Sequence, residues 1–318
     1  MEQRKLIKLG NSSFAIALPK DWVDKAGLKK GENVFLEENG NGEITVKPKS
    51  DEKVNHKETT VNAENKDSEE LKRELRMAYV RGYTSLQIRG IKDKENKEVL
   101  REIIKSLVGF ELVDLGEKEI KAQDFFSMTD ANLTNFIRRI DNNIREIFEI
   151  VIDEIKKGKI STKKVKEIEE IDQDVNKFYF LCSRIFLRGI DNPSILTTLK
   201  TTGISLFNDW WIAFNLESLT DSIKYFFKAL QKEENIQKNE ELRRIISELY
   251  EAYTNCMEAF YKKDIDLAEK STNLTKEIRE NIQKMEKEEP SISALSHDLR
   301  KINRQIYQNA KMILYLKY

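Results

Sequence analysis

Short strand-like segments fill the first fifty residues of a chain whose remainder has the pattern of long amphipathic helices. The apolar run Phe14–Leu18 is typical of a strand, and Pro19 ends it because proline cannot donate to a strand ladder. Further on, the Asn-Gly-Asn-Gly turn at residues 39–42 is flanked by two more strand-like runs, which is typical of a hairpin. The sequence therefore predicts a small β-rich domain over residues 1–48.

Composition favours a helix-rich protein of several domains. The chain has 318 residues, 35% of them charged, with only four prolines. Lysine plus arginine equals aspartate plus glutamate at 55 each, so net charge indicates neither nucleic acid nor membrane as a partner. We find no signal-peptide-like start and no apolar run of about 18 residues, so we expect a cytoplasmic protein without membrane insertion.

Two further residue counts narrow the chemistry. There are only two histidines, and no glycine-rich phosphate loop or nucleophile beside a base, so we do not expect an enzyme. Cys182 and Cys256 are far apart in helical patterns, which is typical of buried free thiols in a reducing compartment.

Four regions follow the β-rich domain in the predicted multidomain fold. Residues 49–68 are almost wholly polar and read as a flexible linker. Alternating helix and strand patterns predict a small α/β module at 69–127. Two sets of three helices, at 130–231 and 232–318, each predict an antiparallel bundle. The expected helices are 130–157, 163–188, 194–231, 238–263, 265–287 and 291–317.

The β-rich segment resembles the AbrB/SpoVT/MazE swapped-hairpin family. The resemblance rests on four features: Arg4-Lys5, Lys8-Leu9-Gly10, Leu18-Pro19-Lys20, and the Leu28–Glu32 segment before the final hairpin. It implies an obligate homodimer whose interleaved strands present basic side chains to DNA.

The charge distribution of this segment is consistent with DNA binding. Residues 1–50 hold nine Lys or Arg against seven Asp or Glu, a net charge of +2, and most of the basic residues precede residue 31. Lysine and arginine on a rigid sheet can neutralise phosphates, and arginine can also read guanine edges. The candidate DNA-binding residues are Arg4, Lys5, Lys8 and Lys20. The alternative is a domain that only dimerises, or binds a protein partner as antitoxins do.

The C-terminal half resembles PhoU, a phosphate-signalling regulator built from two three-helix repeats. Residues 215–222, NLESLTDS, look like the family's leucine-glutamate-x-x-x-aspartate signature, and residues 168–181 resemble its other acidic helix. The order of an AbrB-like and then a PhoU-like part is similar to an archaeal type of PhoU-related regulator. The resemblance implies a metal on the bundle surface, with Asp172 contributing from the neighbouring helix.

The acidic pair Glu217 and Asp221 has a physical logic of its own. The two residues are four apart, so their carboxylates share one helix face and continue an apolar stripe. Such like charges repel unless a cation neutralises them, and oxygen-rich sites suit Mg, Mn, Ca or Fe ions. Asn176 is neutral where the family has a second acid. The alternative is a solvated acidic face paired with lysines.

In the second repeat both signature acids are replaced by arginines, Arg300 and Arg304, again four apart. Two arginines on one face can bind an anion such as phosphate, or form salt bridges with nearby acids. The sequence leaves both readings open.

Together these features predict a DNA-binding transcriptional regulator linked to phosphate uptake, whose helical bundles sense a metal or a partner. The alternative is a cytoplasmic adaptor that modulates a phosphate transporter or sensor kinase, with the N-terminal domain serving only to dimerise. A third reading is an antitoxin-like binding protein.

Overall fold

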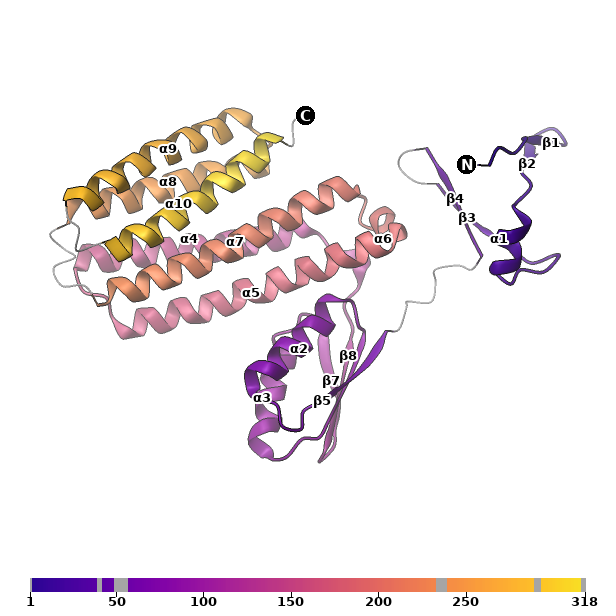
Figure 1. Cartoon of the computed structure of the whole chain (residues 1–318), viewed down its shortest axis with the longest axis horizontal. Coiled ribbons are helices and arrows are strands. Elements are labelled where there is room, and N and C mark those ends of the chain that lie inside the picture. The colour runs from indigo at the N-terminus through magenta and orange to yellow at the C-terminus, as the bar shows by residue number, and fades with distance from the viewer. Residues whose placement is uncertain (1, 39–41, 49–56, 233–238, 289–292, 316–318) are drawn as a thin grey trace. The chain divides into compact units, whose positions relative to one another are not determined.

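A computed structural model describes residues 2–38, 42–48, 57–232, 239–288 and 293–315. The chain divides into two compact units, residues 1–56 and 57–318 (Figure 1). They correspond to a small β-rich unit, and to a larger unit that contains an α/β module and a long helical region. The predicted multidomain fold is confirmed.

The N-terminal unit consists of two hairpins joined by a short helix. Strands β1 (Ile7–Leu9) and β2 (Ser13–Ala15) pair antiparallel, and so do β3 (Phe35–Glu38) and β4 (Ile44–Lys47). The helix α1 (Lys20–Lys25) begins directly after Pro19, whose extended backbone forms its N-cap. Most of the predicted turn at 39–42 lies outside the described residues.

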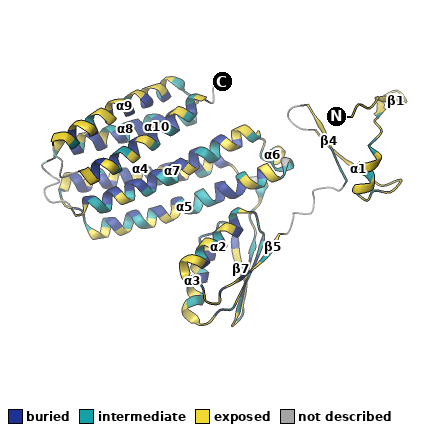
Figure 2. Ribbon diagram, in the orientation of Figure 1, coloured by how far each residue is buried: buried dark blue, intermediate teal, exposed yellow. Residues whose placement is uncertain are grey.

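The N-terminal unit has no core of its own. None of its described residues is buried, as the absence of dark blue in this part of Figure 2 shows. Isolated two-stranded sheets are marginal in water, so the hairpins need an additional apolar surface to be stable. The exposed large apolar side chains are Leu6, Ile7, Leu9, Phe14, Ile16, Phe35, Leu36 and Ile44.

The α/β module is a four-stranded sheet with two helices. Its strand order is β5-β6-β8-β7, with β5 and β6 parallel and the other pairs antiparallel. Figure 1 shows α2 and α3 together on one face of the sheet. The elements are β5 (Glu58–Asn62), α2 (Ser68–Val80), β6 (Ser85–Arg89), α3 (Lys94–Lys105), β7 (Phe110–Leu115) and β8 (Glu119–Asp124).

Strand β5 corrects the predicted linker at 49–68. Residues 58–62 pair with β6, and Val61 packs into the core of the module. The strand is otherwise polar, so its own sequence lacks the apolar alternation that indicates a strand. The helix α2 that follows is well marked: Asp67 and Glu70 form a reciprocal capping box, and its apolar residues recur at helical spacing.

The helical region contains two sets of three long helices (Figure 1). The first set is α4, α5 and α7, and the second is α8, α9 and α10. A 3-10 turn (Met128–Asp130) precedes them, and a short helix α6 (Pro193–Thr198) lies between α5 and α7. The long helices are α4 (Leu133–Lys157), α5 (Thr162–Asp191), α7 (Gly203–Leu230), α8 (Glu240–Lys262), α9 (Ile265–Glu288) and α10 (Ser293–Tyr315).

The single helix predicted over 194–231 is wrong, because the chain breaks between α6 and α7. Lys200 has a positive φ of 52°, which ends α6. The Thr202 hydroxyl then accepts a hydrogen bond from the Ser205 backbone N–H at 3.1 Å and caps the new helix. Hydroxyl groups in such positions compete with continuous helical hydrogen bonding.

The two helix sets share one hydrophobic core that runs from α4 to α10. A buried polar contact also joins them: the Asp141 carboxylate in α4 accepts hydrogen bonds from the hydroxyls of Tyr253 at 2.7 Å and Tyr261 at 3.1 Å in α8. Both cysteines are buried free thiols, as predicted, and burial raises their pKa. Among the described helices, none combines the length and the apolar character needed to cross a bilayer.

Arg184 of α5 fastens the α/β module to the first helix set. Its side chain is completely buried, and its guanidinium donates to the Tyr79 carbonyl oxygen and to the Asp124 carboxylate. The guanidinium also lies 4.7 Å from the centroid of the Tyr79 ring. One cation therefore holds the end of α2 and the end of β8 against the same helix.

We expect Arg184→Met to lower the free energy of unfolding by about 3 kcal/mol, because it removes the hydrogen-bonded cation of buried Asp124 and leaves only Arg188, at 4.0 Å, near it. Thermal and urea unfolding of the full chain measure this loss. Adding Asp124→Leu is expected to restore part of it, since an apolar pair needs no charge compensation. Arg279→Met, at an exposed site on α9, is the control. Equal losses of stability in Arg184→Met and Arg279→Met would contradict this role of Arg184.

Candidate functional site

The four candidate DNA-binding residues lie at the start of the N-terminal unit. Arg4 and Lys5 precede β1, Lys8 lies within β1 opposite Phe14 of β2, and Lys20 is the first residue of α1. All four are exposed. Within the described residues, only Arg4 of this group forms an ion pair, with Glu2 at 2.6 Å.

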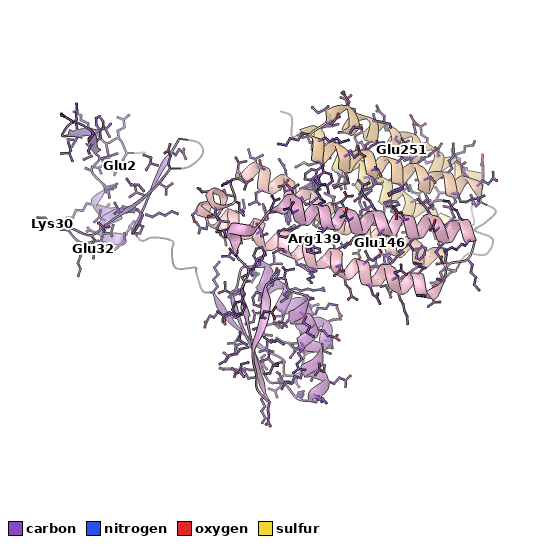
Figure 3. All side chains as sticks on the ribbon, turned by 180° about the vertical axis from the view of Figure 1, so that it is seen from behind. Glu2, Lys30, Glu32, Arg139, Glu146 and Glu251 are labelled. Atoms are coloured by element: carbon purple, nitrogen blue, oxygen red, sulfur yellow. The ribbon has the colours of Figure 1, made fainter. Side chains whose placement is uncertain are left out.

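The ammonium groups of Lys5, Lys8 and Lys20 thus remain available to an anionic partner. No acidic side chain that the structure describes in this unit forms an ion pair with them; Glu32, labelled with Lys30 and Glu2 in Figure 3, instead accepts a hydrogen bond from the Lys29 backbone N–H at 2.9 Å. The sequence did not indicate the ion pair between Arg4 and Glu2, because side chains so close in the chain can point toward each other or apart.

The predicted acidic site lies between α5 and α7, and a lysine occupies its centre. The Lys224 ammonium is 2.8 Å from a carboxylate oxygen of Asp172 and 2.5 Å from one of Asp221. Asp172 is buried, and α5 and α7 pack along much of their length. The structure therefore brings two of the three predicted acids together around a cation that belongs to the chain.

Glu217 is the third acid, one turn before Asp221 on α7. Burial, together with the neighbouring carboxylates of Asp221 and Asp172, raises the pKa of its carboxyl to about 7. Its one direct hydrogen bond is a long one, 3.4 Å from the Ser218 hydroxyl. Burial also raises the pKa of Asp172, while its hydrogen bond from Lys224 lowers it.

This arrangement of donors does not fit a metal ion. Lys224 already forms ion pairs with Asp172 and Asp221, and the Asn176 amide N–H donates to the Asp172 backbone carbonyl at 2.9 Å. Within the ranges that the structure describes, no group of three or more His, Cys, Asp or Glu is placed to hold a metal. Metal binding by Asp172, Glu217 and Asp221 stays a prediction, and it requires Lys224 to move away.

The arginine pair of the second set is divided between two environments. Arg300 forms a two-pronged salt bridge with Glu286 of α9, at 2.5 and 3.4 Å. Arg304, one turn further along α10, is exposed and has no ion pair among the described residues. The salt-bridge alternative therefore applies to Arg300, whose charge is neutralised by Glu286.

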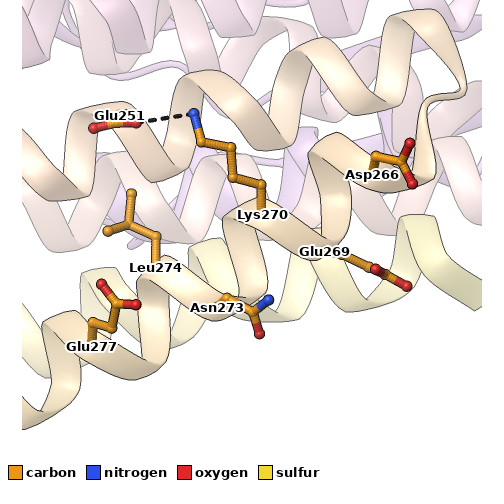
Figure 4. Close-up of a pocket in the computed structure, with 7 residues that line it drawn as sticks. All are labelled: Glu251, Asp266, Glu269, Lys270, Asn273, Leu274 and Glu277. Atoms are coloured by element: carbon orange, nitrogen blue, oxygen red, sulfur yellow. Dashed lines mark ion pairs between the residues drawn. The ribbon is translucent and has the colours of Figure 1, made fainter.

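An acidic groove of about 440 Å³ lies between α8 and α9, a feature that the sequence did not single out (Figure 4). Lys270 forms an ion pair with Glu251 across it at 3.2 Å, and both side chains are more than half exposed. The remaining acids come from successive turns of α9. Their spacing is visible in the sequence, but it does not distinguish a groove from an ordinary solvated helix face.

Comparison with known proteins identifies the N-terminal unit alone. The family model described as "Antidote-toxin recognition MazE, bacterial antitoxin" matches residues 7–54. This segment is a MazE/AbrB-like domain, and a largely helical region follows the α/β module. No curated protein and no solved structure matches the chain.

We expect Glu217→Gln to remove a pH dependence of stability. The raised pKa means that the folded state holds a proton that the unfolded chain loses above about pH 4.5. The stability from this group is full below that pH and is lost as the pH rises through about 7. The neutral variant should therefore be more stable than wild type at pH 8, by on the order of 1 kcal/mol.

Urea unfolding of both proteins between pH 4 and pH 8 measures this difference. Glu280→Gln on the exposed side of α9 is the matched control and should track wild type. Parallel pH profiles for Glu217→Gln and wild type would show that Glu217 is an ordinary solvated carboxylate.

Proposed function

We propose that this protein is a DNA-binding transcriptional regulator that acts as a homodimer through its N-terminal domain. The observation that carries the proposal is the MazE/AbrB-like match over residues 7–54, together with three exposed lysines of the N-terminal unit that form no ion pair with the acidic residues described. The helical region serves as the responsive part, linked to phosphate uptake.

Dimerisation follows from the missing core of the N-terminal unit. Side chains such as Phe14 on β2 and Leu36 on β3 expose most of their surface to solvent. A second copy of the same hairpins is self-complementary by symmetry and supplies the apolar surface that one copy lacks. The resemblance to the swapped-hairpin family implies the same arrangement.

DNA binding uses the basic side chains of that dimer. Lys8 lies on a paired strand and Lys20 on the first turn of a helix, so both are held by regular backbone hydrogen bonds. Each unpaired ammonium can neutralise a phosphate and release a counterion, which makes affinity strongly dependent on salt. Two copies double the number of such contacts and give the binding surface a twofold axis that suits a palindromic site.

The link to phosphate rests on the resemblance of the helical region to PhoU. A signal reaches the DNA-binding domain only if the ligand or partner favours one arrangement of the protein over another. In this proposal the response uses contacts to the helical sets and the α/β module. It does not require a metal ion at Asp172, Glu217 and Asp221.

A second candidate function is recognition of a protein partner by the N-terminal domain. The matching family model is described by antidote-toxin recognition, which is binding to a protein. On this reading the N-terminal unit dimerises and holds a partner, and the chain is an adaptor for a phosphate transporter, a sensor kinase or a toxin-like protein.

Fluorescence anisotropy with a labelled mixed-sequence DNA duplex separates these two functions. We expect binding at low salt, and a steep loss of affinity as salt rises. The double variant Lys8→Gln/Lys20→Gln removes four contacts per dimer, so affinity should fall by more than about tenfold and the salt slope should become shallower. The control Lys163→Gln/Lys166→Gln changes two exposed lysines on α5 and should bind like wild type.

Absence of DNA binding at low salt, or equal affinity of the two double variants, would exclude the DNA-binding proposal and favour the adaptor. Mapping of chromosomal occupancy in high and low phosphate then tests the signal separately. Occupancy that does not change with phosphate would remove the link to phosphate uptake and leave DNA binding intact.

A further inference from the structure

A cleft of about 490 Å³ lies where α2 of the α/β module meets α5 of the first helix set. Its volume is within the range of sites for small molecules. Helix α2 contributes basic side chains and two apolar ones, and α5 contributes two aromatic rings and Leu187. The residues come from segments about a hundred positions apart, held together by the buried Arg184 contacts.

The lining of this cleft carries an excess of positive charge. Four cations, Lys72, Arg73, Arg76 and Arg81, face one carboxylate, that of Glu69. Lys72 is 3.7 Å from Glu69, whereas the three arginines form no ion pair among the described residues. Most other arginines of the larger unit form an ion pair with Asp or Glu, for example Arg89, Arg101 and Arg145. The three arginines of the cleft differ from them in this respect.

Arg76 is the most confined of the three arginines. Its guanidinium lies over the ring of Phe180 at 4.8 Å, and its Nε is buried without a hydrogen-bond partner. A buried donor without an acceptor costs free energy, which an anion in the cleft would recover. Glu217 and Asp172 are close enough to influence Arg76 electrostatically, but neither forms a direct contact with it.

The other wall of the cleft carries two aromatic rings, which are tilted by 45° to each other. The rings of Tyr179 and Phe180 lie with their centroids 5.2 Å apart, and Tyr179 also packs against Phe214 of α7 at 6.2 Å. Met77 and Val80 of α2 and Leu187 of α5 add apolar surface. The lining thus combines aromatic rings with aliphatic groups.

We propose that this cleft binds a small anion that carries an aromatic ring, of the nucleoside phosphate class. Guanidinium groups bind phosphate oxygens in a bidentate manner, and Arg73 and Arg76 lie three positions apart on one face of α2, which suits one phosphate chain. The base stacks on the aromatic wall from α5. The site does not depend on DNA binding by the N-terminal domain.

Ligand binding in this cleft also affects how the α/β module packs against the helix bundle. One wall belongs to the α/β module and the other to the helix bundle, so an occupant contacts both. A ligand that binds only when the two are packed together stabilises that packing in proportion to its occupancy. The cleft therefore couples a soluble small molecule to the arrangement of the module and the bundle.

Isothermal titration calorimetry of the full chain with ATP as the probe tests this assignment. We expect saturable binding in wild type, and binding at least about tenfold weaker in Arg73→Gln/Arg76→Gln, because two charge-assisted contacts are lost. Adenosine and inorganic phosphate, each lacking half of the recognised groups, should bind at least tenfold more weakly than ATP. Arg243→Gln/Arg244→Gln on α8 is the control for charge alone.

Arg73→Glu, at an exposed position, gives a second test that does not disturb the packing of Arg76 on Phe180. It should weaken ATP binding while leaving the thermal unfolding temperature unchanged. No heat with ATP, or equal ATP affinity in wild type and both Arg73 variants, would overturn the site. Inorganic phosphate binding as tightly as ATP would overturn the assignment to the nucleoside phosphate class.

Discussion

The N-terminal domain exposes the apolar side chains that would otherwise form its core, so its stability depends on a second apolar surface. Two short hairpins and a six-residue helix bury none of their described side chains. Such a unit is stable only when another surface covers it, and a second copy is the simplest source. In the proposed dimer, each polypeptide contributes its long C-terminal unit, and a change in that unit acts on a pair of proposed DNA-binding surfaces.

Within the larger unit, several charged side chains form ion pairs with opposite charges of the same chain. Arg184 pairs with Asp124 at the junction of module and bundle, Lys224 pairs with both Asp172 and Asp221, and Arg300 pairs with Glu286. This matching agrees with the equal totals of acidic and basic residues. By contrast, Lys5, Lys8 and Lys20 of the N-terminal domain form no ion pair among the described residues, and neither do the three arginines of the cleft between α2 and α5.

The sequence predicted the architecture well where a pattern is local. The long helices follow from apolar periodicity, and apart from the break between α6 and α7 the observed ends lie within a few residues of those expected. Strand β5 was missed because only Val61 in it is clearly apolar, and its pairing with β6 is not a local property. The break at Lys200 was missed because Thr202 caps a new helix inside a continuous pattern.

The candidate sites were harder to predict because they depend on packing. Asp172, Glu217 and Asp221 were found from spacing and resemblance, but the position of Lys224 between α5 and α7 is a matter of how two helices meet. The cleft lined by Arg76 and Phe180 joins helices that are distant in sequence. No spacing rule connects such residues.

Sedimentation equilibrium of the full chain tests the central claim most directly. We predict a dimer in wild type and a monomer in Phe14→Asp/Leu36→Asp, because charges on the exposed apolar strands prevent the surface from being covered by a second copy. Tyr225→Asp, at an exposed aromatic residue of α7, should remain a dimer. A wild-type monomer at micromolar concentration, or a dimer that survives the double substitution, would contradict the account.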